Sequence, residues 1–478
     1  MFKSIKHRRV FEIFKEISNI PRGSSNMEKI SDYCVEFAVR HNLDYIKDDA
    51  SNVIIYKNAS KGYENCEPII LQGHLDMVCQ KTESSDIDFL NQGLSIYTDG
   101  DFLKARDTSL GADNGIAVAM IMAILESSEL LHPPIEAVFT TDEEIGLLGA
   151  TALDASVLKS KRMINIDSEE GNTVTVSCAG GIRFSAFLPY NKEKLSGTKL
   201  TVCIEGLLGG HSGVEIDKGR VNADLLMARV LYSLKKRCDF RITSVSGGDK
   251  DNAIPNCAKA VLVCDDCDIV ISNATDILNV IKAEISSREK DFSFSFIKGE
   301  KGDFFVIDEK AEDKLLFALN TTPCSVMEMS AEIKGLVETS LNLGVLATED
   351  EKIVFHYALR SNKETALSWL IARLEIFYSV IDCQTETSGY YPPWEFNQSS
   401  KLSKLYSKAY LETVGEPPLI KAIHAGLECA VFSKKIKGLD CISIGPQLFD
   451  VHTVNERLSV SSTQRIFEIL IKLLENLE

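Results

Sequence analysis

Seven acidic and histidine residues stand in short polar segments beside apolar runs of the chain. They are His74, Asp76, Asp113, Glu143, Glu144, Asp167 and His452. Carboxylates and imidazoles are the protein groups that most often hold catalytic metal ions. Two such ions, about 3.5 to 4 Å apart, lower the pKa of a shared water toward about 7. The residue types therefore predict a centre for two metal ions.

A count of ligands supports this prediction. If Asp113 bridges two ions, each ion has three protein contacts, and a shared water completes two four-coordinate sites. The ligands are then His74, Asp113, Glu144, Asp167 and His452. Two imidazoles with carboxylates and no thiolate favour two zinc ions per chain, although cobalt or manganese would also be accommodated.

The remaining two residues have roles beside the ligands. Of the neighbours Glu143 and Glu144, one can coordinate while the other accepts a proton from the attacking water, and local sequence does not decide between them. Asp76 lies two residues after His74 on an extended segment, so both side chains point the same way. We therefore expect Asp76 to orient the ring of His74.

Short apolar strands alternate with helices in the first third of the chain, which is typical of an α/β fold with a covered, mostly parallel sheet. We expect strands at 52–56, 68–71, 135–139 and 163–166, and helices at 7–18, 27–41 and 115–125. The candidate residues follow these strands, at the sheet edge where ligands bind in such folds.

The pattern changes to α+β from about residue 183 and changes back at the prolines near residue 391. We expect helices at 221–235, 274–287 and 363–378 inside this segment, and at 400–414 and 461–477 after it, with a strand at 441–444. The sequence thus predicts a domain of residues 183–390 inserted into a domain made of residues 1–182 and 391–478.

Composition excludes several classes of function. Of the 478 residues, 69 are acidic and 52 basic, and the net charge of −17 argues against nucleic-acid binding, which needs a basic patch. The sequence contains no run of about 18 apolar residues, so we expect no membrane span. The 13 dispersed cysteines favour a reduced, cytoplasmic protein.

Five separated motifs resemble those of the co-catalytic zinc peptidases, in the expected order. They are Gly73–Val78, Asp107–Gly115, Thr141–Gly146, Asn165–Glu170 and Val451–Thr453. More narrowly, the chain resembles the aminoacyl-histidine dipeptidase family over essentially its whole length, including Gly209–Gly213, Asn252–Pro255 and His424–Glu428. The resemblance implies a catalytic α/β domain of the zinc-peptidase type and an inserted α+β lid domain.

The resemblance also implies roles for single residues. His74 and Asp167 would hold one zinc, Glu144 and His452 the other, and Asp113 would bridge them. Glu143 would be the general base and Asp76 the residue that orients His74. In the lid domain, His211 would face the scissile carbonyl, while Asn252 and Arg360 would contact substrate. His424 would contact substrate or cap the helix expected at 428–433.

The expected reaction is hydrolysis of unblocked dipeptides, of the Xaa-His type such as β-alanyl-histidine, by a hydroxide shared between two zinc ions. The alternatives are an N-acyl amino acid amidohydrolase of the same clan and a catalytically silent metal-binding scaffold, against which the intact Glu143 argues. A homodimer through the lid domain is left open, as is whether His211 serves its own active site or a neighbour's.

Overall fold

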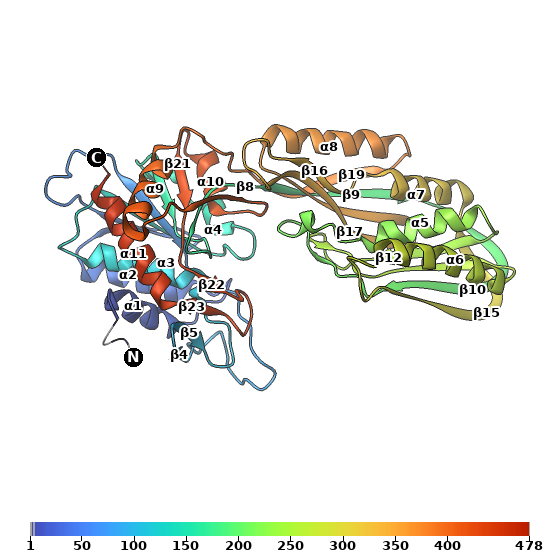
Figure 1. Ribbon diagram of the computed structural model, residues 1–478, viewed down its shortest axis with the longest axis horizontal. Coiled ribbons are helices and arrows are strands. Elements are labelled where there is room, and N and C mark those ends of the chain that lie inside the picture. The colour runs from blue at the N-terminus through green and yellow to red at the C-terminus, as the bar shows by residue number, and fades with distance from the viewer. Residues whose placement is uncertain (1, 3–4, 478) are drawn as a thin grey trace. The chain divides into compact units, whose positions relative to one another are not determined.

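The computed structural model describes residue 2 and residues 5–477, which form a mixed α/β protein (Figure 1). The chain divides into two compact units. The first contains Met1–Cys178, Trp394–Ala422 and Leu427–Glu478, and the second contains Ala179–Pro393 and Ile423–Gly426. The short segment 423–426, which the sequence places in the C-terminal part of the first domain, therefore groups with the second unit.

An eight-stranded sheet forms the centre of the first unit. In spatial order its strands are β1 (Asp44–Lys47), β2 (Val53–Lys57), β6 (Ile135–Thr140), β3 (Ile69–His74), β7 (Arg162–Asn165), β21 (Asp440–Ser443), β8 (Thr173–Cys178) and β20 (Leu419–Ile423). The four strands β6, β3, β7 and β21 run parallel to one another. Every residue of β3 and β6 is buried, including Gln72 and His74 in β3 and Glu136 and Thr140 in β6.

Helices cover this sheet. They are α1 (Arg8–Ser18), α2 (Glu28–Arg40), α3 (Ala112–Glu126), α4 (Leu148–Ala152), α9 (Lys401–Val414), α10 (Glu428–Lys435) and α11 (Val460–Glu475). Helix α3 packs against α1 and β3, and all its residues except Asp113 and Glu126 are buried. The expected mostly parallel α/β fold is confirmed.

A small sheet beside the large one positions the last ligand candidate. Its strands, in order, are β22 (Leu448–Phe449), β23 (Arg457–Ser459), β5 (Phe102–Ala105) and β4 (Ile96–Asp99). The loop between β22 and β23 carries His452. Because β23 pairs with β5, this late segment is anchored to a part of the chain that precedes α3.

The second unit is an antiparallel sheet with helices on one face (Figure 1). Its strands, in order, are β15 (Ser293–Ile307), β10 (Lys192–Glu205), β14 (Ala258–Cys264), β12 (Arg241–Gly247), β17 (Val337–Thr348), β18 (Lys352–Ser361), β9 (Gly180–Pro189) and β19 (Gln384–Tyr391), with β16 (Ser325–Met329) beside β17. The helices are α5 (Ala223–Lys235), α6 (Cys267–Ile285), α7 (Glu309–Thr321) and α8 (Glu364–Ser379). Alternate strand residues such as Leu200, Val202 and Ile204 join the core beneath them.

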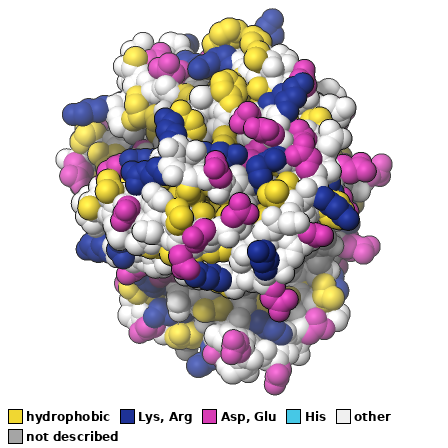
Figure 2. Space-filling view, turned by 90° about the vertical axis from the view of Figure 1, so that its right-hand side faces the viewer, with side chains coloured by type: hydrophobic (Ala, Val, Ile, Leu, Met, Phe, Trp, Pro, Cys, Tyr) yellow, Lys and Arg dark blue, Asp and Glu magenta, His cyan; other side chains and the backbone are white. Residues whose placement is uncertain are grey.

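Two features of the molecule concern binding to membranes and to other macromolecules. Within residue 2 and residues 5–477, no helix combines the length and the apolar character needed to cross a membrane. On the side of the molecule drawn in Figure 2, basic and acidic side chains are interspersed, and hydrophobic side chains lie among them.

Candidate metal centre

The register of the parallel strands brings the candidate residues to one edge of the sheet. His74, the last residue of β3, lies opposite Thr140, the last residue of β6. On the other side of β3, Gln72 pairs with Asn165, where β7 ends. The segments that leave these strands therefore begin side by side, and they carry Glu143, Glu144 and Asp167.

Two clusters of possible ligands share Asp113. In the first, His74 Nε2 lies 3.0 Å from Asp113 Oδ1 and 3.4 Å from Asp167 Oδ1. In the second, His452 Nε2 lies 3.1 Å from Asp113 Oδ2 and 2.9 Å from Glu144 Oε1. Asp113 thus presents one carboxylate oxygen to each histidine. In each cluster the ligand atoms lie within 4.8 Å of one another.

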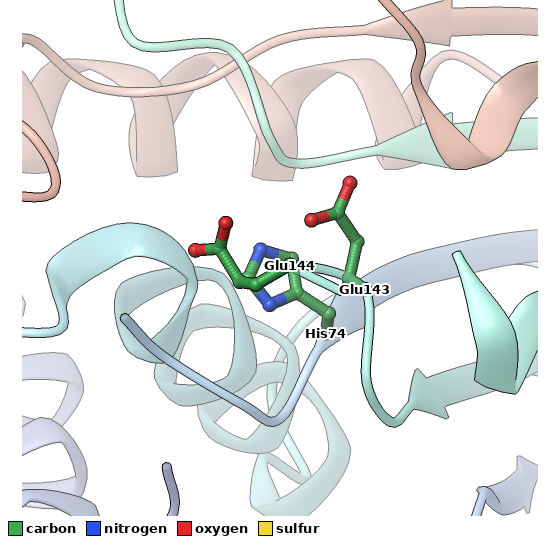
Figure 3. Close-up of side chains that lie close together, drawn as sticks. All are labelled: His74, Glu143 and Glu144. Atoms are coloured by element: carbon green, nitrogen blue, oxygen red, sulfur yellow. The ribbon is translucent and has the colours of Figure 1, made fainter. Parts of the chain in front are cut away.

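A third group contains His74, Glu143 and Glu144, whose ligand atoms also lie within 4.8 Å of one another. Figure 3 shows both glutamate side chains projecting to the same side as the His74 ring. Only Glu144 of the pair belongs to the cluster of His452. The two neighbouring carboxylates therefore have different surroundings, a distinction that the local sequence leaves open.

Asp76 contacts the ring of His74 and also the backbone of Glu143 and Glu144. Its Oδ1 lies 3.4 Å from His74 Nδ1, and its two oxygens accept hydrogen bonds from the backbone N–H groups of Glu143 and Glu144, at 3.0 and 3.2 Å. The hydroxyl of Ser24 donates a fourth contact at 2.8 Å. Burial alone would raise the pKa of Asp76, but His74 and these donors lower it. The side chain is therefore a fixed anion.

Asn114 is a site residue that the sequence reasoning missed. Its Oδ1 accepts the backbone N–H of His74 at 3.1 Å, and its Nδ2 donates to the Asp167 carboxylate at 2.8 Å. Asn114 therefore fixes the positions of two predicted ligands. The available signal was its place directly after Asp113, inside a motif already identified as functional.

Two carboxyl groups of the centre, those of Asp167 and Glu143, have raised pKa values. Burial raises the pKa of Asp167 to about 6, with the charges of Asp113 and Glu144 acting in the same direction against His74. Burial likewise raises the pKa of Glu143 well above its usual range, and Asp167 and Glu428 add to this. Hydrogen bonds to Asp113 and Glu144 raise the pKa of His452 to about 11.

Such an accumulation of buried carboxylates favours the binding of cations. The donors are imidazole nitrogens and carboxylate oxygens, a set that suits divalent ions such as zinc. Each cluster offers one imidazole and a share of the same aspartate. The residues present therefore fit two metal ions.

His211 and Asn252 meet in the second unit. Strand β11 (Gly210–His211) pairs with β13 (Ala253–Ile254), and the carbonyl of Asn252 accepts the N–H of Ser212 at 2.9 Å. His211 Nδ1 accepts the N–H groups of Gly213 and Val214 at 3.1 and 3.2 Å. Burial and the charge of Arg360 lower the pKa of His211. The neutral ring therefore carries its hydrogen on Nε2, which makes that nitrogen a donor.

Arg360 and His424 are buried in the same unit. The Nη1 group of Arg360 donates to the Tyr391 hydroxyl at 2.7 Å. His424 Nε2 lies 2.7 Å from the Ser340 hydroxyl, and burial with the charge of Arg360 lowers the pKa of His424 to about 3. The hydrogen bonds described for the ring of His424 are with Ser340 and Asn362, and none of them is with the backbone at the start of α10.

Comparison with known proteins identifies the family of this chain. The model of the peptidase family M20/M25/M40 matches residues 70–476. The cytosol non-specific dipeptidase of Escherichia coli is 34% identical over 98% of this chain and 97% of that protein. The crystal structure of an aminoacylhistidine dipeptidase from Vibrio alginolyticus is similar with a TM-score of 0.91 and 33% identity, over 100% of this chain and 98% of that chain.

The aminopeptidase PepT from Bacillus cereus shares the fold, with a TM-score of 0.58 and 14% identity over 98% of each chain. The resemblance to zinc peptidases drawn from the five motifs is confirmed at the level of the family. The chain belongs to the peptidase family M20/M25/M40 and is a hydrolase that acts on peptide bonds.

Proposed function

We propose that this protein is a dizinc dipeptidase that hydrolyses unblocked dipeptides, with a preference for the Xaa-His type. The observation that carries the proposal is the carboxylate of Asp113, which presents one oxygen to His74 and the other to His452. The relative from Escherichia coli and the structure from Vibrio alginolyticus are both more than 30% identical to this chain and are named dipeptidases, the second an aminoacylhistidine dipeptidase.

The proposed ligands are the two clusters that share Asp113. His74 and Asp167 hold one zinc ion, Glu144 and His452 hold the other, and cobalt or manganese can substitute. The two ions, when bound, supply Lewis acidity that polarises a peptide carbonyl and makes water a stronger nucleophile near neutral pH.

Glu143 is the proposed general base. It stands next to a ligand, it is outside the cluster of His452, and its pKa is raised well above the usual range, first by burial. A carboxylate of this kind accepts the proton of the attacking water and delivers it to the nitrogen of the leaving amine. Asp76 holds the backbone of Glu143 in place while it orients His74.

The second unit supplies the proposed substrate contacts. His211 Nε2 carries a hydrogen, and such a donor stabilises the oxyanion that develops on the carbonyl oxygen. Arg360 binds the terminal carboxylate, for which a guanidinium is suited by charge and geometry. Asn252 and His424 complete this proposed set of substrate-binding residues.

A panel of substrates tests the proposal. Zinc-loaded protein should cleave glycyl-histidine and β-alanyl-histidine, whereas N-acetyl-histidine, which lacks the free amine, should remain intact. Comparison with glycyl-leucine tests the preference for histidine. A higher kcat/KM on glycyl-leucine than on glycyl-histidine would contradict that preference. Turnover of N-acetylated amino acids without turnover of dipeptides would establish an acylase instead.

A homodimer through the second unit is the proposed assembly. Trp369, Ile376 and Val380 lie on one side of α8 and its C-terminal end, with 60, 60 and 72% of their surface exposed. Light scattering should report a dimer for the wild type and a monomer for Trp369→Glu. The control Val39→Glu changes an equally exposed residue of α2, 58% exposed, and should stay dimeric. A monomeric wild type would exclude this assembly.

The proposed location is the cytoplasm. All 13 cysteines are free, as expected where thiols stay reduced. The relative from Escherichia coli is named a cytosol dipeptidase.

A further inference from the structure

A glutamate far along the chain holds the start of α3. Glu456 is 3% exposed, and its two oxygens accept the backbone N–H groups of Leu110, Gly111 and Ala112 at 2.8 to 2.9 Å, with that of Asp113 at 3.4 Å. These are the groups that a helix leaves without partners at its beginning. The N-cap residue Gly111 has no side chain to satisfy them, so Glu456 takes that role.

Glu456 stands only four residues after His452. The loop between β22 and β23 therefore supplies both a proposed ligand and the carboxylate that fixes the backbone of Asp113. Because Asp113 Oδ2 lies 3.1 Å from His452 Nε2, the distance between these two ligands depends on the same loop.

A buried arginine holds the other side of the same turn. Arg22 is 2% exposed, and its Nη1 donates to the carbonyls of Leu75 and Asp76 at 3.0 and 3.2 Å, while its Nη2 donates to the carbonyl of Gly111. Its positive charge is attracted by Glu456 and Asp76. Arg22 thus connects the segment after His74 to the turn before Asp113.

The glycines of this turn leave room for the guanidinium. A Cβ atom added at Gly111 or at Gly115 would lie 2.6 Å from Arg22 Nη2, so a larger residue at either position would displace the guanidinium. Gly111 also has a φ of +64°, a conformation that favours glycine. The spacing of the two glycines around Asp113 is therefore matched to Arg22.

We propose that Arg22 and Glu456 are positioning residues that act on the turn 110–113 and that each supports mainly one of the two metal sites. Glu456 sets the site of Asp113, Glu144 and His452, and Arg22 sets the site of His74, Asp113 and Asp167. This inference rests on the proposed dizinc function. Groups that orient metal ligands typically contribute about 10- to 100-fold to metal affinity.

The test is a titration of metal-free protein with Zn²⁺ in competition with a chromophoric chelator. Glu456→Gln should weaken the site that contains His452 about 10- to 100-fold and the other site, which shares Asp113, by a smaller factor, with an isotherm like that of His452→Ala. Arg22→Met should resemble His74→Ala instead. Arg22→Lys, which keeps the charge and one donor group, should fall between Arg22→Met and the wild type.

Matched controls separate positioning from general destabilisation. Glu136→Gln changes another buried glutamate that accepts backbone N–H groups, those of Lys159 and Ser160. Lys57→Met removes a cation that donates to carbonyls at the other end of α3, those of Ile124 and Leu125. Both controls should keep the two wild-type affinities, even where the thermal midpoint falls.

Three outcomes would overturn the inference: unchanged affinities in the test variants, equal weakening of both sites in each variant, or equal effects in the controls. A wild type that binds no zinc would instead refute the proposed function. In that case, amide hydrogen exchange of the metal-free proteins still tests the role of Glu456. Glu456→Gln should exchange faster at residues 110–113, and unchanged exchange there would refute the role of Glu456.

Discussion

The two units bury polar groups of opposite character. In the first, Asp76, Asp113 and Asp167 form an anionic centre that is held by imidazoles and backbone or amide N–H groups. In the second, Arg360 and two histidines with lowered pKa values form a neutral to cationic group. The first suits metal cations, and the second suits the carbonyl and carboxylate oxygens of a peptide. The proposed reaction needs both groups of residues. A variant that loses one group should therefore be recognisable because the other group keeps its function.

The largest expected effect separates proton transfer from metal binding. Glu143→Gln keeps the shape of the side chain but removes its basicity, so kcat should fall about 10²- to 10⁴-fold. Zinc content should stay at two ions per chain by elemental analysis. Glu170→Gln, an exposed change close to Asp167, should retain full activity. Full turnover in Glu143→Gln would show that another group is the base.

A change in the second unit should lower kcat without touching the metal centre. His211→Ala removes the Nε2 donor, and loss of one such donor typically costs about 10²- to 10³-fold in kcat. His211→Asn, which restores an N–H group, should recover part of the loss, and KM should change little in both. A rise in KM at constant kcat would instead assign His211 to ground-state binding.

The smallest effect concerns stability of the metal-free protein. Glu428 accepts hydrogen bonds from Gln72 and Thr140, and burial, with the charges of Asp167 and Asp76, raises its pKa from 4.5 to about 7. The folded state therefore binds a proton more tightly than the unfolded state, and the stability so gained below pH 4.5 is lost as pH rises through about 7.

Urea unfolding at pH 5 and pH 7.5 measures this loss. Glu428→Gln cannot ionise and should flatten the pH dependence in part, because Asp167 and Glu169 have raised pKa values and contribute with the same sign. Glu170→Gln should leave the dependence unchanged. An identical slope in Glu428→Gln would mean that this carboxyl is already ionised at pH 5.

The strands and helices of the first unit could be predicted from the sequence more fully than the side-chain contacts between them. The buried parallel strands β3 and β6 contain the apolar runs 69–71 and 137–139, so these strands and the polar residues that follow them can be recognised in the sequence. The helix at 309–321 was not predicted, although its amphipathic sequence is typical of one. In α3, the backbone of Asp113 and Asn114 is not helical, a detail that the sequence does not indicate.

Contacts between distant segments could not be predicted. Asn114 and Glu456 are ordinary polar residues in their local sequence, and their partners lie up to 346 residues away. In the second unit, the tautomer of His211 depends on backbone N–H groups within its own turn, which only the folded loop reveals. Ligand types can therefore be inferred from sequence, whereas the groups that orient them require the fold.

The contact between Glu456 and residues 110–113 can form only late in the synthesis of the residues that make up the site. A nascent chain contains the start of α3 more than 300 residues before the glutamate that holds it is translated. At roughly 5 to 20 residues per second, that interval is about 15 to 70 s. Asp113 and His74 emerge long before His452, so the growing polypeptide carries an incomplete, strongly acidic cluster until His452 has been translated.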